Sequence, residues 1–103
     1  MGTSIVDTIE DASRLVSQGP TVCAVGVFDG VHIGHRQLLN GAIEEGRARG
    51  GTSLVFTFRN HPLSVLAPAY APLLLDEPDE KIRRIRELRP AMVLATEFDH
   101  RLA

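Results

Sequence analysis

The sequence predicts an α/β protein whose parallel sheet is the first half of a doubly wound fold. Two short apolar runs, at residues 21–27 and 52–58, flank a segment whose apolar residues recur at helical spacing. A third run, at residues 91–95, follows a second amphipathic segment and Pro90. This strand, helix, strand order predicts parallel strands joined by right-handed crossovers. If the third, second and first strands are neighbours in that order, the first lies at the switch point where such folds bind ligands.

The composition is that of one ordinary globular domain, with 44% hydrophobic and 23% charged residues among 103. A formal net charge of -2 gives no sign of binding to nucleic acid or to a membrane surface. No apolar run approaches the ~20 residues of a membrane span, and the first residues lack the pattern of a secretory signal. Cys23 is the sole cysteine, which excludes an intrachain disulfide and favours a cytoplasmic protein.

The N-terminal segment is predicted to be one helix from Ile5 to Gln18. Its apolar residues recur at helix-like spacing at Ile5, Ile9, Ala12, Leu15 and Val16. Asp7 or Thr8 would cap it, and Gly19 with Pro20 would end it.

The first predicted strand, Thr21 to Val27, is apolar at nearly every position, so we expect both of its faces to be covered. The following helix is expected to begin at His35 or Arg36 and to end near Arg49, before two glycines. Its buried stripe is predicted to be Leu38, Leu39, Ala42, Ile43 and Gly46. The second strand then spans residues 52–58.

Between the second and third strands we expect an ordered loop, with one helical turn at residues 63–66, and then a helix. Acidic residues and a proline at 76–79 are typical of a helix start. The predicted buried face of this helix is Ile82, Ile85 and Leu88. The basic residues are assigned to its solvated outer face: Lys81, Arg83, Arg84, Arg86 and Arg89.

The loop after the first strand carries residues suited to phosphate chemistry. Gly30 and Gly34 allow a close approach of the backbone. The first turn of a helix directs its N–H groups and the positive end of its dipole toward an anion. His32 and His35 can add N–H donors to phosphoryl oxygens. The alternatives are a pair of surface histidines and, for Asp29, a loop carboxylate that bonds neighbouring backbone amides.

Two blocks carry a family resemblance. Residues 26–35, Gly-Val-Phe-Asp-Gly-Val-His-Ile-Gly-His, resemble the signature of the FMN adenylyltransferase module of bacterial bifunctional riboflavin kinase/FAD synthetase, in the nucleotidylyltransferase superfamily. Residues 57–62, Thr-Phe-Arg-Asn-His-Pro, are similar to the Thr-Phe-x-x-His-Pro segment of that family. The resemblance runs from Val22 to the last residue and departs at Val27, where asparagine is more usual. It implies a Rossmann-like nucleotidylyltransferase fold.

The resemblance implies adenylyl transfer from ATP to FMN, with Mg²⁺ accompanying the ATP and no residue assigned as a metal ligand. Asp29 would orient the loop or the metal-bound nucleotide. His32 and His35 would be the catalytic residues. The implied ATP and phosphate contacts are Gly26, Phe28, Asp29, Gly30, His32, Gly34 and His35. The implied flavin or nucleotide contacts are Asn60, His61 and Pro62, residues that also suit a turn before a proline.

We expect a partial domain, residues 1–103, with about three strands. The first strand would then be a bare sheet edge, which proteins normally cover. Either the remaining half of the domain or self-association would cover it. The family's Ser/Thr-rich segment ending in arginine and its riboflavin kinase module have no counterpart here. A non-catalytic nucleotide-binding remnant, or a fragment of the enzyme, is therefore the alternative function.

Overall fold

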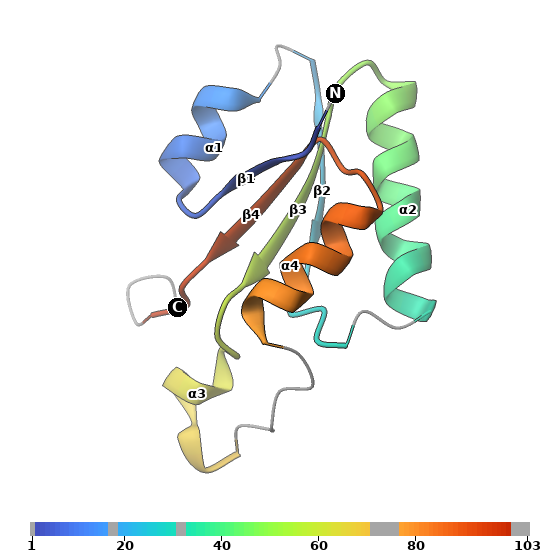
Figure 1. Cartoon of the computed structure of the whole chain (residues 1–103). Helices are drawn as coiled ribbons and strands as arrows, with labels where there is room; N and C mark the ends of the chain where they lie inside the picture. Colours follow the sequence, from blue (N-terminus) through green and yellow to red (C-terminus); the bar gives the residue numbers. More distant parts are fainter. Residues whose placement is uncertain (1, 17–18, 31–32, 71–76, 100–103) are drawn as a thin grey trace.

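The computed structural model describes residues 2–16, 19–30, 33–70 and 77–99. Four strands form one parallel sheet in the order β1-β4-β3-β2 (Figure 1). Their bounds are Ser4–Val6 for β1, Thr21–Val25 for β2, Thr52–Phe58 for β3 and Met92–Thr96 for β4. The helices are α1 (Ile9–Leu15), α2 (Ile33–Ala48), α3 (Leu63–Leu66), the short 3₁₀ helix η1 (Pro68–Tyr70) and α4 (Pro78–Glu87).

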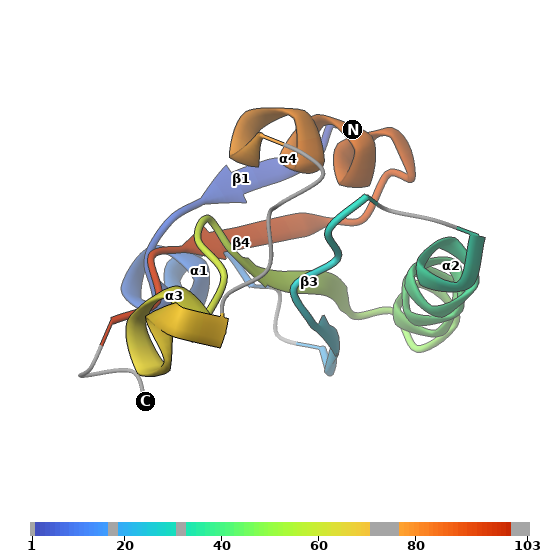
Figure 2. The same cartoon turned by 90° about the horizontal axis from the view of Figure 1, so that it is seen from below.

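Helices cover both faces of the sheet (Figures 1 and 2). On one face, α2 and α4 pack on the central strands, where Leu39 and Ile85 lie against Val55 and Val93. On the other face, α1 packs on β4 through Ala12. The core therefore lies above and below β3 and β4.

The central prediction of the sheet is confirmed. The second predicted strand has the bounds of β3, and it pairs in parallel with β2 on one side and β4 on the other. The third, second and first predicted strands are neighbours in that order. The helical turn expected at residues 63–66 is α3.

The prediction of one helix from Ile5 to Gln18 is wrong. Residues 4–6 form β1, which pairs in parallel with β4, so the sheet has four strands rather than three. Helix α1 begins only at Ile9, after Thr8, whose hydroxyl accepts a hydrogen bond of 3.1 Å from the N–H of Asp11. A capping side chain at this position ends the extended segment and starts the helix.

The prediction that both faces of the strand at residues 21–27 are covered is also wrong. β2 ends at Val25 and is an edge strand of the sheet. Ala24 lies in the core under α2 and α4, whereas the side chain of Val25 is 62% exposed and Cys23 is exposed. In the part of the chain that the structure describes, α1 packs on β4 and not on β2, so this second face of β2 is left exposed.

Two helix predictions need correction. Helix α2 begins at Ile33, before the predicted start, and Leu38 of its predicted buried stripe is 56% exposed. In α4, Lys81 is only 4% exposed, so it belongs to the buried face and not to the solvated one. This burial brings Lys81 to the end of the sheet that carries both sequence motifs.

Candidate functional site

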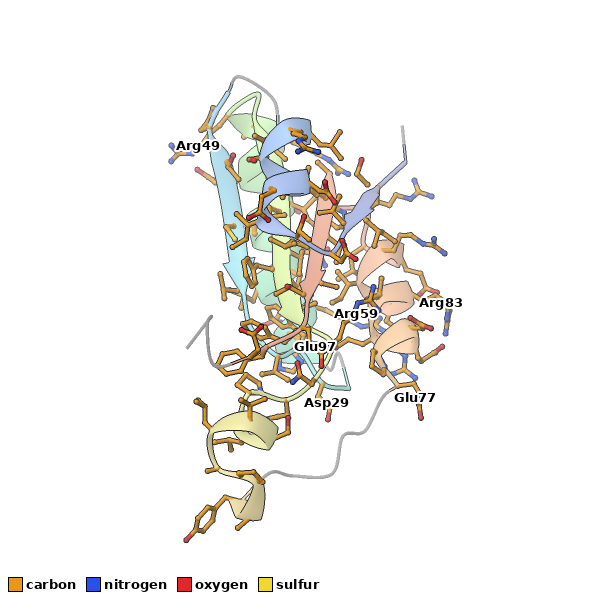
Figure 3. The ribbon with its side chains drawn as sticks, turned by 90° about the vertical axis from the view of Figure 1, so that its left-hand side faces the viewer. Asp29, Arg49, Arg59, Glu77, Arg83 and Glu97 are labelled. Atoms are coloured by element: carbon orange, nitrogen blue, oxygen red, sulfur yellow. The ribbon has the colours of Figure 1, made fainter. Side chains whose placement is uncertain are left out.

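Both motif segments leave the carboxyl ends of neighbouring parallel strands. Residues 26–30, here called the glycine loop, follow β2, and residues 59–62, here called the second loop, follow β3. Figure 3 shows Asp29, Arg59 and Glu97 at this end of the sheet and Arg49 at the other. The outside of the carboxyl ends of the strands is where open α/β sheets bind their ligands.

The glycine loop has an unusual backbone. Phe28 has a φ of 54° and Gly30 a φ of 80°, both in the left-handed region that costs a bulky residue energy. Phe28 nevertheless turns its ring into the core, where the residue is 4% exposed. A Cβ at Gly26 would lie 2.9 Å from that ring, so only glycine leaves room for it. A ligand contact from Phe28 would therefore come from its backbone.

His35 lies in the first turn of α2, half-buried, with its ring edge-on to Phe28 at a centroid distance of 5.5 Å. Gly34 precedes it in the same turn and is exposed. The predicted catalytic residue His32 lies outside the described residues. The structure thus brings His35, Gly34 and the glycine loop together at the positive end of a helix, which favours an anion.

The side chains of the second loop contact the protein itself. The Asn60 amide donates to the carbonyl oxygen of Phe98 (3.0 Å) and accepts from the N–H of Phe98 (2.7 Å). Nδ1 of His61 accepts from the N–H of Leu63 (3.1 Å), so neutral His61 carries its proton on Nε2. Pro62 is the N-cap of α3. Asn60 thereby fastens the chain that follows β4 to this end of the sheet.

A buried lysine joins the two loops. Nζ of Lys81 donates to the carbonyl oxygen of Val27 (2.8 Å) and to that of Phe58. The hydroxyl of Thr57 donates to the same Val27 oxygen (3.0 Å). The backbone after β2 is therefore held against the end of β3 by side chains of β3 and α4.

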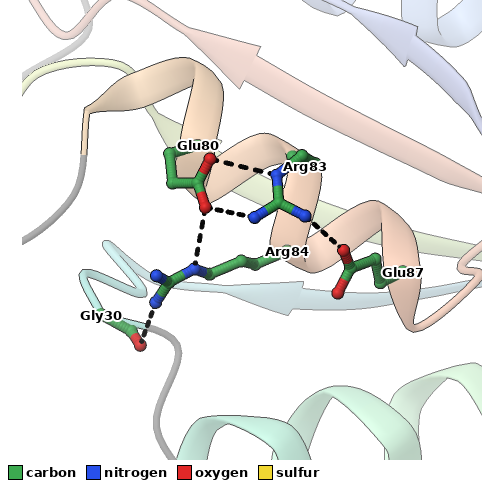
Figure 4. A network of polar contacts seen from close by, with 5 residues as sticks. All are labelled: Gly30, Glu80, Arg83, Arg84 and Glu87. Atoms are coloured by element: carbon green, nitrogen blue, oxygen red, sulfur yellow. Dashed lines mark hydrogen bonds and ion pairs between the residues drawn. The ribbon is translucent and has the colours of Figure 1, made fainter.

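Sequence reasoning placed both Lys81 and Arg84 on a solvated face, and it missed their contacts with the motif. Nη1 of Arg84 donates to the carbonyl oxygen of Gly30 (3.4 Å; Figure 4). One signal could have found the lysine. Lys81 stands four and seven residues before Ile85 and Leu88, a spacing that puts all three on one helix face.

The exposed side of α4 carries a row of ion pairs (Figure 4). Arg83 contacts Glu80 and, at 2.5 Å, Glu87, and Nε of Arg84 lies 3.4 Å from Glu80. The hydrogen bond from Arg83, with smaller contributions from Arg84, lowers the pKa of Glu80 from its usual 4.5. Nη1 of Arg59 lies 3.5 Å from Asp79, which adds a contact between the second loop and α4.

Among the described residues, no three side chains of histidine, cysteine, aspartate or glutamate come together as they would around a metal ion. None of the helices described is long and apolar enough to cross a membrane.

A parallel sheet with helices on both faces, and a glycine-containing turn at its carboxyl edge, defines a Rossmann-like α/β domain. The family model of FAD synthetase matches residues 15–103 of this chain. The chain therefore belongs to the FAD synthetase family.

Curated relatives from several bacteria align with most of this chain. A bifunctional riboflavin kinase/FMN adenylyltransferase of Escherichia coli K12 is 43% identical over 99 residues, which are 96% of this chain and 31% of the relative. The protein of the same name from Bacillus subtilis is 35% identical over 83 residues, which are 80% of this chain and 26% of the relative. The chain thus spans less than a third of the length of these two curated relatives.

A solved structure confirms the fold. A Streptococcus pneumoniae protein described as a macrolide-efflux protein superposes with a TM-score of 0.72 at 25% identity. The match covers 96% of this chain and 33% of that one. The Rossmann-like arrangement expected from the sequence is therefore present in the described residues.

Proposed function

We propose that this chain is part of an FMN adenylyltransferase, which transfers AMP from ATP to FMN and yields FAD and pyrophosphate. One observation carries the proposal: the two motif loops leave adjacent parallel strands at the same edge and are joined there by Lys81. The names of the bacterial relatives support the choice of FMN as acceptor.

In the proposed reaction, a phosphate oxygen of FMN attacks the α-phosphorus of ATP. The new P–O bond forms as the bond from the α-phosphorus to the bridging oxygen breaks, and pyrophosphate leaves with that electron pair. The FMN phosphate is already ionised, so no general base is required. The protein has to position the reactants and stabilise phosphate charge.

We assign that charge stabilisation to the start of α2. His35 and the backbone of Gly34 lie in its first turn, beside the glycine loop. His32, by its place in the motif, would act with His35. Gly30 would let the pyrophosphate part of ATP approach the backbone, and Gly26 would support the loop by leaving room for the ring of Phe28.

Mg²⁺ would enter as part of the ATP complex. Mg²⁺ in such sites usually binds one or two protein carboxylates together with substrate phosphates and water. Asp29, a half-buried carboxylate on the glycine loop, fits that requirement. When bound, the ion neutralises phosphate charge.

The second loop would form the wall on the flavin or nucleotide side. His61 is the polar contact we propose there, because its N–H lies on Nε2 once Nδ1 has accepted from Leu63. Asn60 and Pro62 would shape this wall through Phe98 and α3.

We further propose a cytoplasmic location for the protein. We also propose that the exposed edge of β2 pairs with a further chain segment or with a second copy of this chain.

The test is turnover and binding on the same preparation. The chain is incubated with MgATP and FMN, FAD is followed by chromatography, and MgATP binding is measured by calorimetry. FAD formation that is lost in the double variant His32→Ala/His35→Ala supports the enzyme. MgATP binding without FAD supports the alternative, a non-catalytic nucleotide-binding remnant. Absence of both would contradict a nucleotide site in this chain.

A further inference from the structure

Lys81 is the sole lysine of the sequence, and it is almost completely buried, with 4% of its surface exposed. Lysine is seldom buried to this extent unless it has partners. Burial of an ammonium group is costly, so its protons must be bonded. Two of its partners are the carbonyl oxygens of Val27 and Phe58.

These two carbonyls belong to different parts of the site. Val27 is in the glycine loop, and Phe58 is the last residue of β3, directly before the second loop. An ammonium is a compact charge with three N–H donors, so one group can bond both oxygens at once. The bonds from Nζ, together with the bond from the Thr57 hydroxyl to the same Val27 oxygen, therefore hold the two loops at a fixed separation.

Other contacts from α4 reach the same two segments. Arg84 donates to the carbonyl oxygen of Gly30 in the glycine loop, and Asp79 pairs with Arg59 in the second loop. Asp79 is 97% exposed, however, and the Arg84 bond is long, so Lys81 is the buried connection among the three.

We propose that Lys81 is a positioning residue that aligns the two substrates of the adenylyl transfer. This inference rests on the proposed function. ATP held at the glycine loop and FMN held at the second loop react only when the attacking oxygen is in line with the α-phosphorus. By fixing the separation of the loops, Lys81 sets that alignment without touching either substrate.

The kinetic test compares Lys81→Met, which keeps the length of the side chain but removes its donors, with Lys81→Arg, which keeps a buried cation. Misalignment predicts that Lys81→Met lowers kcat about 100-fold while both KM values change little. Lys81→Arg is expected to recover part of this loss. Arg86→Met, which removes an exposed cation from the same helix, is the matched control and should behave as wild type. Equal kcat for Lys81→Met and wild type would overturn the proposal.

If the wild-type chain forms no FAD, that result counts against the proposed function and not against the role of Lys81. Hydrogen exchange then tests the role of Lys81 directly. In Lys81→Met, amides at residues 26–30 and 59–61 should exchange at least about tenfold faster, while those of β4 keep their protection. Unchanged exchange in both loops would exclude the connection.

A measurement on the unmodified chain covers the case in which Lys81→Met does not fold. The ε-amine of Lys81 should react with acetic anhydride at least about tenfold more slowly in the native chain than in the urea-unfolded chain, since a buried amine reacts only after local opening. Equal rates would show that the amine is accessible, and would overturn the proposal.

Discussion

The two motif loops lie side by side but are built differently. The glycine loop has two residues with positive φ, Phe28 and Gly30, and its sole aromatic ring is turned into the core. The second loop uses its polar side chains on the protein: Asn60 bonds Phe98, and His61 bonds the N–H of Leu63. The glycine loop is held through its backbone carbonyls by side chains of other elements, whereas the second loop is fastened by its own side chains.

This difference shows that a family motif contains both residues that shape the fold and residues that can contact a ligand. In the glycine loop, Gly26 makes room for a packed ring, and the imidazole of His35 lies further along, in the first turn of α2. In the second loop, Asn60 holds the segment after β4 in place. We therefore expect substitutions in α2's first turn to affect catalysis, and those in the second loop to affect stability first.

The largest effect is expected for His35→Ala. Removal of one preorganised donor to a transition-state charge lowers kcat about 100- to 1000-fold. Unfolding by urea should change little, because His35 is half-buried and its ring lies at the edge of the core, against Phe28. FAD formation and urea midpoints are measured on both His35→Ala and His61→Ala. A larger loss of kcat in His61→Ala than in His35→Ala would reverse the assignment of the two loops.

The second effect concerns Asn60. Its replacement by alanine leaves the N–H and the carbonyl of Phe98 without their partner, which costs about 1–3 kcal/mol of unfolding free energy. Asn60→Asp is the matched control, since a carboxylate can accept from Phe98 but cannot donate to it. Urea unfolding should rank wild type above Asn60→Asp and Asn60→Ala lowest. Equal stability of all three chains would show that these two hydrogen bonds do not stabilise the fold.

Much of the sheet could be predicted because its signals are local. β3 is a short run rich in apolar residues, is bounded by glycines before and a polar turn after, and has the predicted ends. The three-residue strand β1 offers too short a pattern to detect. Ile5 and Ile9, four residues apart, imitate a helix stripe although Ile5 lies in the strand and Ile9 starts α1.

The sequence located the two loops of the candidate site, but not the contacts that join them. The motifs located the glycine loop and the second loop, because those residues stand directly after strands. The role of Lys81 could not be predicted from charge, since a lysine near a helix surface usually extends its ammonium into water. Its burial depends on two carbonyls that lie 54 and 23 residues away in sequence. Similarly, nothing local shows that α1 leaves the outer face of β2 open.

A smaller loss of stability is expected when the packing of the glycine loop is changed. In Gly26→Ala, the new Cβ meets the ring of Phe28 at 2.9 Å, and overpacking of this kind costs about 1–2 kcal/mol. The double variant Gly26→Ala/Phe28→Leu should lose less than the sum of the two single variants, because the smaller side chain relieves the contact. Unfolding free energies of the four chains form the cycle. Strict additivity would show that the ring and Gly26 do not interact.

The smallest expected effect is a pH dependence of the unfolding free energy that arises from the exposed ion pairs of α4. These pairs contrast with the buried contacts of Lys81 on the same helix. Arg83 lowers the pKa of Glu80 from 4.5 in the folded chain, so the folded state favours the carboxylate. The stabilisation is present above the unfolded value of 4.5 and is lost as pH falls through the lower folded pKa. Glu80→Gln should therefore be slightly less stable than wild type at neutral pH and equal to it in acid. The pair is half-exposed, so added salt should also shrink the difference. A gap between the two chains that persists in acid would mean that Glu80 acts by packing, and not through its charge.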